Sequence, residues 1–455
     1  MPSEIHCWAE AEVGHVQLGD RRLNRRLVRI VSTLAAHPTA SVPHAAPDWA
    51  GTKAIYRFWD SERVQQEDIL AAHRRSTLVR VQGRDLVLAL QDTTSLDFST
   101  HGSTKGLGPI EHPSRHGLLV HSLLLATPEG VPLGLLDHQV WARDPAQTGP
   151  RHRRRQRPTE QKESQRWITA LAAAAEHVPA SSQVITIADR EADIYDLMAA
   201  PRREGADLLV RVAQNRRVAH EAHTLWNAIR QQRVQGRWQV RLQRRDSQRP
   251  RTATLNISFA ALDVLPPLDR PKREGLQPVP VSVVLAEETE APAGISPVRW
   301  LLLTTLPVTT LDEAVQCVQW YSCRWLIERY HYVLKSGCKI EELQLQEARR
   351  LQLALTTYAI VAWLLLWLTY QARRDPEGSC EQALAPHEWR SLYCFHHKTA
   401  VPPERPPTLR ESVRWIAMLG GFLGRKHDGE PGVNVLWRGW IRLQDISATW
   451  KTICG

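Results

Sequence analysis

The chain has 455 residues, 43% hydrophobic and 23% charged; this is an ordinary globular composition, and the length predicts two or three domains rather than one core. Its formal charge of +10 at pH 7 favours a polyanionic partner, with nucleic acid as the first choice. Of the 58 basic residues, 49 are Arg and nine are Lys. Arg binds phosphate with two donors, although the codon bias of a GC-rich genome explains the excess equally well.

Three Glu lie within the first twelve residues and no apolar core accompanies them, so we expect no signal peptide there. Residues 18–36 predict a helix, because apolar side chains recur at helical spacing after Asp20, a good N-cap. Arg22 and Arg26 belong to the basic side of this helix, which suits contact with DNA. An ordinary charged helix surface explains them nearly as well.

A continuous apolar run over residues 86–90 predicts a strand covered on both faces, which delivers Asp92 to solvent at its end. Two further strands over 118–126 and 131–140, joined by a turn-like segment, complete an antiparallel meander of three strands. The Arg cluster at 151–157 is typical of a flexible loop, either in contact with nucleic acid or simply solvated.

An Ala-rich helix over 160–176 leads to a strand over 183–188, which ends at Asp189. Because helical crossovers between strands of one sheet are right-handed, this strand is expected to run parallel to a neighbour. If that neighbour is the strand over 86–90, Asp92 and Asp189 lie side by side.

Next, a helix over 190–200 and a strand over 207–212 precede a β-rich insertion over 214–298, where helical periodicity is lost. Residues 202–251 contain 13 Arg, no Lys and four acidic residues, so about nine of the ten excess charges fall in this stretch. Arg211 lies within it and is a further candidate for DNA contact.

A buried strand over 300–304 precedes a long helix predicted over 312–335. Four side chains of this helix project within an arc of about 60° at 100° per residue. They are Tyr321, Arg324, Glu328 and Lys335. A face with an aromatic hydroxyl, two cations and one carboxylate suits a phosphodiester lying along the helix; a solvated, salt-bridged face is the alternative.

The last part of the chain begins with an uncharged run over 351–372 that is long enough to span a bilayer. Polar residues within it and arginines at both ends indicate a buried core helix instead. Linkers rich in Pro then lead to a helical segment over 409–444. The seven Cys include no Cys-x-x-Cys pair, which argues against a disulfide framework and fits a reducing cytoplasm.

Three segments stand out together: Asp92 in Gln91-Asp92-Thr93-Thr94-Ser95, Asp189 in Asp189-Arg190-Glu191-Ala192-Asp193, and the Tyr-x2-Arg-x3-Glu-x6-Lys series that begins at Tyr321. They resemble the DDE transposases of the insertion-sequence-four family, most closely the transposon-five type. Shorter matches follow in the family's order from Leu18-Gly19-Asp20 to Leu419-Gly420-Gly421-Phe422. Each short match is weak, but the ordered set is highly specific.

The resemblance implies a ribonuclease H-like α/β fold: a mixed sheet with a β-rich insertion, plus N-terminal and C-terminal helical domains. The implied division is an N-terminal helical DNA-binding domain over 1–70, a catalytic domain over 71–372 and a C-terminal helical dimerisation region over 373–455. The β insertion would occupy residues 214–298 of the catalytic domain.

Carried over position by position, the resemblance makes Asp92, Asp189 and Glu328 the metal ligands. Three converging carboxylates repel one another unless divalent cations share them. Hard oxygen ligands suit Mg²⁺, with Mn²⁺ as a substitute, and two ions per active site would serve in-line displacement at phosphorus. Asp97 is a rival carboxylate but does not match the motif. No small-molecule cofactor is expected.

Tyr321, Arg324 and Lys335 match family positions that hold DNA phosphates near the cleavage point. Trp300 and Trp325 match positions associated with a flipped base at the transposon end, where stacking on the aromatic ring contributes roughly 1–3 kcal/mol and offsets lost duplex stacking. Ordinary packing is the alternative for both, because the chain has 17 Trp.

We therefore expect a bacterial, cytoplasmic cut-and-paste transposase, nucleoid-associated when bound to DNA and without a membrane partner. It would bind double-stranded DNA at its terminal inverted repeats and at the target, form a homodimer in the synaptic complex, and cleave through a hairpin intermediate. The alternative is a catalytically inactive or host-adopted DNA-binding derivative. A hydrolase that acts on sugars with a carboxylate pair is a weaker third possibility, and it predicts little salt dependence of binding.

Overall fold

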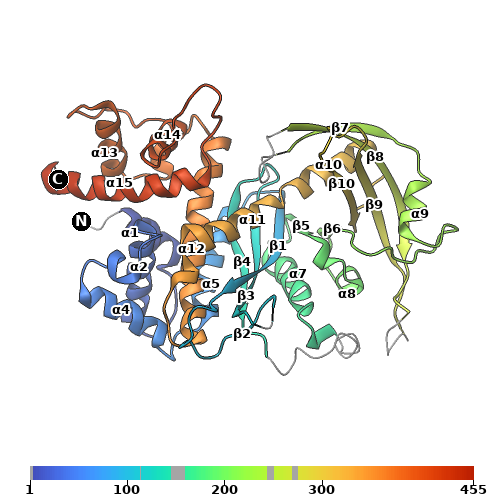
Figure 1. The fold of residues 1–455 in the computed structure, drawn as a ribbon, viewed down its shortest axis with the longest axis horizontal. Coiled ribbons are helices and arrows are strands. Elements are labelled where there is room, and N and C mark those ends of the chain that lie inside the picture. The colour runs from blue at the N-terminus through green and yellow to red at the C-terminus, as the bar shows by residue number, and fades with distance from the viewer. Residues whose placement is uncertain (1–3, 113, 145–158, 243–250, 269–274, 455) are drawn as a thin grey trace. The chain divides into compact units, whose positions relative to one another are not determined.

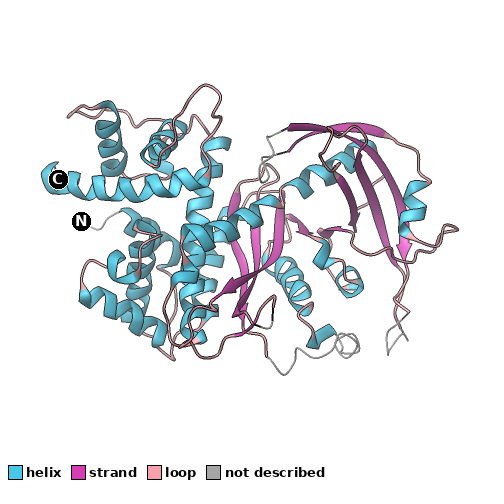
Figure 2. Cartoon of the chain, viewed as in Figure 1, coloured by secondary structure: helices cyan, strands magenta, loops and turns pink. Residues whose placement is uncertain are grey.

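The computed structural model describes residues 4–112, 114–144, 159–242, 251–268 and 275–454. The Arg cluster at 151–157 therefore lies outside the described residues. The chain is mixed α/β, with a large mixed sheet and helical N-terminal and C-terminal regions, as the sequence predicts (Figure 2). It divides into two compact units. The first, here called the helical unit, comprises Met1–Gln82, Thr93–Gln147 and Leu326–Gly455; the second, the sheet unit, comprises Gly83–Asp92 and Thr148–Trp325.

The helical unit begins with five helices. They are α1 (Glu4–Val13), α2 (Arg21–Ala36), α3 (Val42–Ala45), α4 (Trp49–Asp60) and α5 (Gln66–Val81). The α2 helix confirms the prediction for residues 18–36: the Asp20 side chain accepts a hydrogen bond from the Arg22 backbone N–H, and the apolar stripe that includes Leu27, Ile30 and Leu34 is buried.

A single long helix, α12 (Ala348–Arg374), forms the core of the helical unit and contacts α2, α4, α5 and the C-terminal helices (Figure 1). By length and composition it could cross a membrane, but 89% of its most apolar window is buried inside the protein. Helices that are apolar all round are found in the cores of large proteins as well as in membranes. The predicted buried core helix over 351–372 is confirmed.

Three strands of the helical unit, β2 (Gly108–Pro109), β3 (His116–Ala126) and β4 (Pro132–Trp141), form antiparallel pairs, β2 with β3 and β3 with β4. Helix α5 rests on β4 at Gly134. A Cβ at this position would lie 2.0 Å from Oγ1 of Thr77, so the helix can approach the strand this closely only where the strand carries no side chain.

The C-terminal part of the helical unit holds the remaining helices. They are α11 (Trp325–Tyr332), the π-helix η4 (Val333–Gly337), the 3₁₀ helices η5 (Ile340–Glu342) and η6 (Cys380–Gln382), and α13 (Pro386–His397), α14 (Leu409–Leu419) and α15 (Val433–Cys454). The segment predicted as helical over 409–444 is two helices, α14 and α15. Their backbones touch at Gly420 and Gly439, where added Cβ atoms would lie 1.8 and 1.6 Å from carbonyl oxygens of the other helix.

The strands of the sheet unit run in the order β1-β5-β6-β10-β9-β8-β7. Their bounds are β1 (Leu86–Asp97), β5 (Gln183–Ala188), β6 (Ala206–Arg211), β7 (Gly236–Leu242), β8 (Arg251–Val264), β9 (Val279–Glu288) and β10 (Arg299–Thr304). The first three are parallel to one another, as the crossover rule predicts, and the rest are antiparallel. The β-rich insertion predicted over 214–298 therefore extends the sheet with β7, β8 and β9.

The helices of the sheet unit are η2 (Thr159–Gln161), α7 (Gln165–His177), η3 (Arg190–Ala192), α8 (Tyr195–Ala199), α9 (Leu225–Arg230) and α10 (Leu311–Ser322). One buried apolar cluster joins side chains from α7, α8 and α9 to one face of the sheet. The helix predicted over 190–200 is wrong in form, since it is two short pieces. Asp189 explains the first piece, because its side chain accepts a hydrogen bond from the Glu191 backbone N–H and caps a 3₁₀ turn.

Candidate active site

Two carboxylates and a guanidinium stand in one row, just past the stretch over which three parallel strands pair. Leu90 of β1 pairs with Ile187 of β5, so Asp92 and Asp189, each two residues further on, occupy equivalent positions. Ala188 of β5 pairs with Val210 of β6, which puts Arg211 beside Asp189. Residues at equivalent positions of neighbouring parallel strands project from the same face. The predicted neighbourhood of Asp92 and Asp189 is thus confirmed.

One detail of the prediction for Asp92 is wrong. Strand β1 does not end there but continues to Asp97. The β-branched pair Thr93 and Thr94 favours extended backbone, which carries the strand past the point where β5 stops. Asp92 is therefore a mid-strand residue with a side chain 17% exposed, rather than a residue at an open strand terminus.

The helix predicted over 312–335 is broken into α10 and α11, with Cys323 and Arg324 in a turn between them, and the backbone continues as a π-helix from Val333. The N–H groups of Cys323 and Arg324 bond to carbonyls only three residues earlier, Trp320 and Tyr321, which tightens the turn. Because 3₁₀ and π turns do not advance by 100° per residue, the predicted 60° arc of four side chains does not hold.

The break places Arg324 against the carboxylate of Asp92, with Nη1 3.9 Å from Oδ2. Its guanidinium also lies 5.9 Å from the ring centre of Tyr321, the residue that ends the buried face of α10. The ring of Trp300 on β10 meets Tyr321 edge to face, with 5.6 Å between ring centres. Tyr321, Arg324 and Trp300 thus gather beside the row of Asp92, Asp189 and Arg211.

Burial is the largest cause of the pKa shifts of Tyr321 and Arg211. The Tyr321 side chain is 4% exposed, and desolvation raises its pKa against the opposing charges of Arg324 and Arg211, so the hydroxyl keeps its proton. Burial also lowers the pKa of Arg211, whose side chain is hydrogen-bonded to Tyr321 and donates from Nη2 to the carbonyl of Arg299 at 3.0 Å. Arg324 and Arg211 therefore present fixed donors around a neutral phenol.

The three remaining predicted residues lie at or beyond the boundary between the two units. Trp325 is the last residue of the sheet unit, whereas Glu328 on α11 and Lys335 in the π-helix belong to the helical unit; all three are half-buried. In the described part of the chain, no three His, Cys, Asp or Glu side chains lie close enough together to hold a metal ion. Asp92 and Asp189 supply a pair of hard oxygen donors.

The two Arg candidates on the N-terminal helix differ in their surroundings. Arg22 is 87% exposed in its side chain and donates to the Asp20 carboxylate from Nε and Nη2, at 3.3 and 3.2 Å. Arg26 is half-buried. Arg22 is thus accessible to a phosphate, which would compete with Asp20 for the guanidinium.

The basic stretch over 202–251 is not a uniform phosphate-binding surface. Arg202 caps the end of α8 by donating to three carbonyls, and Arg203 donates to carbonyls of Ala175, Val178 and neighbouring loops. Arg216 is buried against Asp193, with Nε 2.6 Å from Oδ1. These three arginines use their donors for hydrogen bonds within the protein. Arg237 on β7, in contrast, is exposed.

Sequence reasoning missed the role of Asp193, which is 2% exposed. One of its oxygens accepts from the N–H groups of Ala213 and Gln214, both at 2.7 Å, and the other accepts from Arg216. This carboxylate ties the segment after Asp189 to the end of β6. Its position four residues after Asp189 was the available signal. His121 is buried, and its Nδ1 is hydrogen-bonded to Oγ1 of Thr93 at 2.8 Å.

Three family models match this chain in succession. Residues 5–64 match a transposase DNA-binding model, residues 156–364 a transposase DDE domain, and residues 360–451 a transposase Tn5 dimerisation domain. Asp189 lies within the segment that the DDE model matches, directly after a parallel strand of the mixed sheet. The chain belongs to the Tn5-like DDE transposases: it is a metal-dependent enzyme of DNA cleavage and strand transfer that binds DNA and forms homodimers.

Proposed function

We propose that this transposase carries out cut-and-paste transposition of its own element by two-metal phosphoryl transfer, with Asp92, Asp189 and Glu328 as the metal-ligating carboxylates. The observation that carries the proposal is the in-register position of Asp92 and Asp189 on adjacent parallel strands. Carboxylates are the hard donors that Mg²⁺ and Mn²⁺ prefer. Two such ions, when bound, supply an activated water or 3′-hydroxyl and stabilise the leaving oxygen.

The side chains around the carboxylates bind and orient the DNA backbone. Arg324 offers its guanidinium 3.9 Å from Asp92, so a phosphate that it holds lies next to the metal ligands. Arg211, next to Asp189 in the row, and the protonated Tyr321 add further donors, and Lys335 is assigned a point charge for the DNA backbone. Donors fixed in advance stabilise charge that develops on the phosphate without the cost of reorganisation.

Trp300 and Trp325 provide aromatic surface for a base extruded at the transposon end, which a hairpin intermediate requires because the two strands must be joined across the duplex. Trp300 is half-buried, and its ring packs edge to face against that of Tyr321. Stacking on such a ring contributes roughly 1–3 kcal/mol per base. The released 3′-hydroxyl closes the hairpin, water reopens it, and the 3′-ends then attack the target.

We further propose that residues 1–70 bind the inverted repeats, that 71–372 catalyse, and that 373–455 hold two copies together in the synaptic complex. The matched regions support this order, since DNA-binding, DDE and dimerisation models follow one another along the chain. A chain of this kind acts where the chromosome is, so we place it in the bacterial cytoplasm, on the nucleoid when bound to DNA.

The deciding experiment uses duplexes that carry the terminal inverted repeat found in the DNA beside the gene, incubated with the full-length protein in Mg²⁺ or Mn²⁺. We expect nicking at the repeat end and a hairpin that runs anomalously on a denaturing gel. Asp92→Asn, Asp189→Asn and Glu328→Gln proteins should bind the duplex and fail to cut it.

Asp97→Asn is the matched control, because Asp97 lies on the same strand but accepts from Ser99 N and Oγ and faces Arg115 at 3.6 Å. Its cleavage should stay near the wild-type rate. Retained Mg²⁺-dependent cleavage by Asp92→Asn would overturn the ligand assignment. Retarded DNA without any nicking by the wild type in Mn²⁺ would favour the inactive, DNA-binding derivative.

A further inference from the structure

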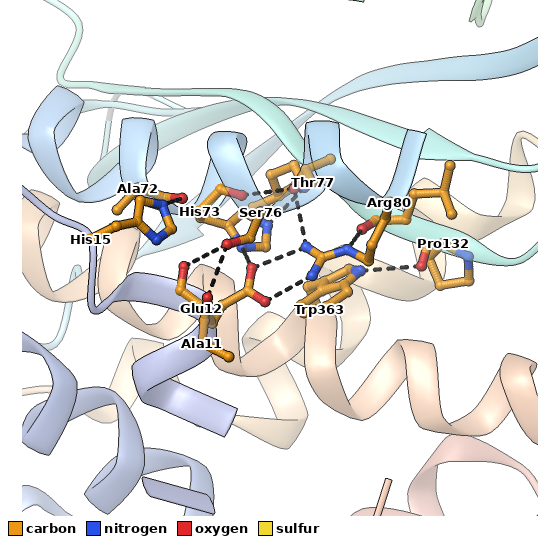
Figure 3. Close-up of polar contacts among 12 residues, drawn as sticks. Ala11, Glu12, His15, Ala72, His73, Ser76, Thr77, Arg80, Pro132 and Trp363 are labelled. Carbon is orange, nitrogen blue, oxygen red and sulfur yellow. Dashed lines mark hydrogen bonds and ion pairs between the residues drawn. The ribbon is translucent and has the colours of Figure 1, made fainter. Parts of the chain in front are cut away.

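A buried carboxylate on the first helix joins α1 to α5 in the helical unit. The Glu12 side chain of α1 is 3% exposed and meets two residues of α5 (Figure 3). Its Oε1 lies 2.5 Å from Nδ1 of His73, and its two oxygens accept from Arg80 Nη1 and Nη2 at 2.8 and 3.0 Å. A buried charge is tolerated only when paired and hydrogen-bonded in this way.

His73 has its protons fixed by its surroundings. The backbone N–H of Leu135 on β4 donates to Nε2 at 2.9 Å, so Nδ1 carries the proton and donates to Glu12. Burial lowers the pKa of His73 further, and the ring is neutral. Burial alone would raise the pKa of Glu12, but its hydrogen bonds and the neighbouring charges outweigh burial and lower it. The carboxylate stays ionised.

Arg80 links α5 to β4 and α12. Its Nε donates to the Leu133 carbonyl of β4 at 2.5 Å, and its guanidinium lies 4.1 Å from the ring centre of Trp363 on α12. The indole of Trp363 in turn donates to the Pro132 carbonyl at 3.2 Å. Figure 3 shows the polar contacts of Glu12 and Arg80 and the bond from Trp363 to Pro132, with the Arg80 guanidinium beside the Trp363 ring. We call Glu12, His73 and Arg80 the α1 clamp.

Helix α1 packs against α2 and α5, and the clamp adds directional contacts to this packing. Ala9 and Val13 are the buried apolar residues among the α1 side chains that the structure describes. A cavity of about 620 Å³ lies beside the helix, and Trp8, Glu12, Arg80 and Trp363 are among its lining residues. Because the helix borders this cavity on one side, directional contacts such as those of Glu12 help to fix its register.

The clamp connects regions with different tasks. Glu12 lies in the segment that matches the DNA-binding model, whereas Trp363, which the Arg80 guanidinium contacts, lies where the DDE and dimerisation models overlap. We propose that the α1 clamp is the joint that holds the DNA-binding region in register with the catalytic fold, so that Glu12, His73 and Arg80 are positioning residues for cleavage. The proposal rests on the proposed function, in which bound repeat DNA must reach the carboxylates at a defined phosphate.

Glu12→Gln tests the clamp without removing volume. The amide oxygen can still accept from Arg80, but the amide NH₂ then faces the Nδ1–H of His73. The ring cannot switch tautomer, because a proton on Nε2 would face the Leu135 N–H. Two N–H donors therefore face each other without an acceptor between them. Arg80 also loses the negative charge of its partner. Glu10→Gln is the matched control: it makes the same chemical change at an exposed position on the same helix.

The full-length protein is assayed for binding of repeat duplex by gel shift, for cleavage rate per bound complex, and by hydroxyl-radical footprinting. For Glu12→Gln we expect the repeat affinity to change less than about threefold, while cleavage per bound complex falls at least tenfold. Protection of the repeat should persist and protection at the cleavage end should fade. Glu10→Gln should match the wild type in all three assays.

Ile360→Val controls for loss of stability, since it trims a buried α12 side chain that is 1% exposed and should lower the melting temperature without separating binding from cleavage. If Glu12→Gln does not fold, Arg80→Lys takes its place, because it keeps the charge and loses the fork to Glu12 and Leu133.

Binding and cleavage that fall together, or an unchanged footprint at the cleavage end, would overturn the clamp proposal. The footprint decides this even where no DNA is cut, whereas absence of cleavage by the wild type overturns the proposed function alone.

Discussion

Asp92 and Asp189 stand at equivalent positions of two adjacent parallel strands, each two residues beyond the paired Leu90 and Ile187. Two anions at this spacing repel unless cations lie between or beside them. Arg324 supplies one such charge from the turn that ends α10. The pair therefore depends on a neighbour that comes from 232 residues further along the chain than Asp92, and that neighbour can be changed without touching either carboxylate.

Arg324→Lys keeps the positive charge but loses the planar fork that can hold a phosphate beside Asp92. We expect the rate of end cleavage to fall about a hundredfold, the size of effect seen when one preorganised donor is removed, with little change in affinity for repeat DNA. Single-turnover cleavage and gel shift measure the two quantities. Arg410→Lys, at an exposed ion pair with Glu430, should behave as wild type. Equal cleavage by both variants would contradict the assignment.

Trp300→Ala removes the aromatic face that meets Tyr321. If the ring stacks an extruded base, the first nick should form at nearly the wild-type rate while hairpin closure slows by roughly five- to a hundredfold, corresponding to about 1–3 kcal/mol. Trp300→Phe should restore most of the rate. An end duplex with an abasic site at the extruded position should reduce the difference between wild type and Trp300→Ala. A defect in the first nick equal to that in hairpin closure would indicate a packing role instead.

Arg216 and Arg237 lie in the same basic stretch, yet their replacements should have opposite effects. Arg216→Ala leaves Asp193 buried without its cation and should cost about 3–5 kcal/mol of stability, seen as a lower melting temperature. Arg237→Ala should leave stability unchanged, and if Arg237 binds a phosphate it should reduce the slope of log K against log salt by about 0.9. An unchanged slope of log K against log salt would show that Arg237 makes no contact with a DNA phosphate.

Buried histidines make the stability depend on pH below neutrality. Burial lowers the pKa of His138 to about 3 and lowers that of His331 well below its ordinary value. Between pH 6.5 and 5 the unfolded chain therefore binds more protons than the native one, so the free energy of unfolding falls as the pH is lowered. Each histidine contributes up to about 1.4 kcal/mol per pH unit.

His138→Gln should make this pH dependence shallower, measured as melting temperature at pH 7.5, 6.5, 5.5 and 5. The exposed His427→Gln is the control and should follow the wild type. Parallel curves for wild type and His138→Gln would refute the attribution to His138.

The pairing of Asp92 with Asp189 was predictable, because an apolar run, a helix and a second apolar run leave a right-handed parallel crossover as the expected connection. The N-cap of α2 and the buried state of α12 followed from local patterns in the same way. These features depend on residues near in sequence or on a general rule of topology.

The break at Cys323 and Arg324 was not predictable from the same patterns. Neither residue breaks helices by itself, and Arg324 is placed by its contact with Asp92, far away in sequence. The sequence also did not predict which arginines of residues 202–251 are bonded within the protein and which are exposed, for a related reason. The partners of Arg202 and Arg203 are backbone carbonyls, which carry no sequence signal, and only the folded chain brings them together.

Strand β7 ends the order of described strands in the sheet unit, so one row of its backbone groups has no strand beside it in that order. Such an edge is a template onto which another chain can add. Arg237 and Arg241 alternate along β7 with exposed side chains. Two copies that met edge to edge would bring these like charges together, and the resulting repulsion protects a protein that works as a dimer from growing into larger aggregates.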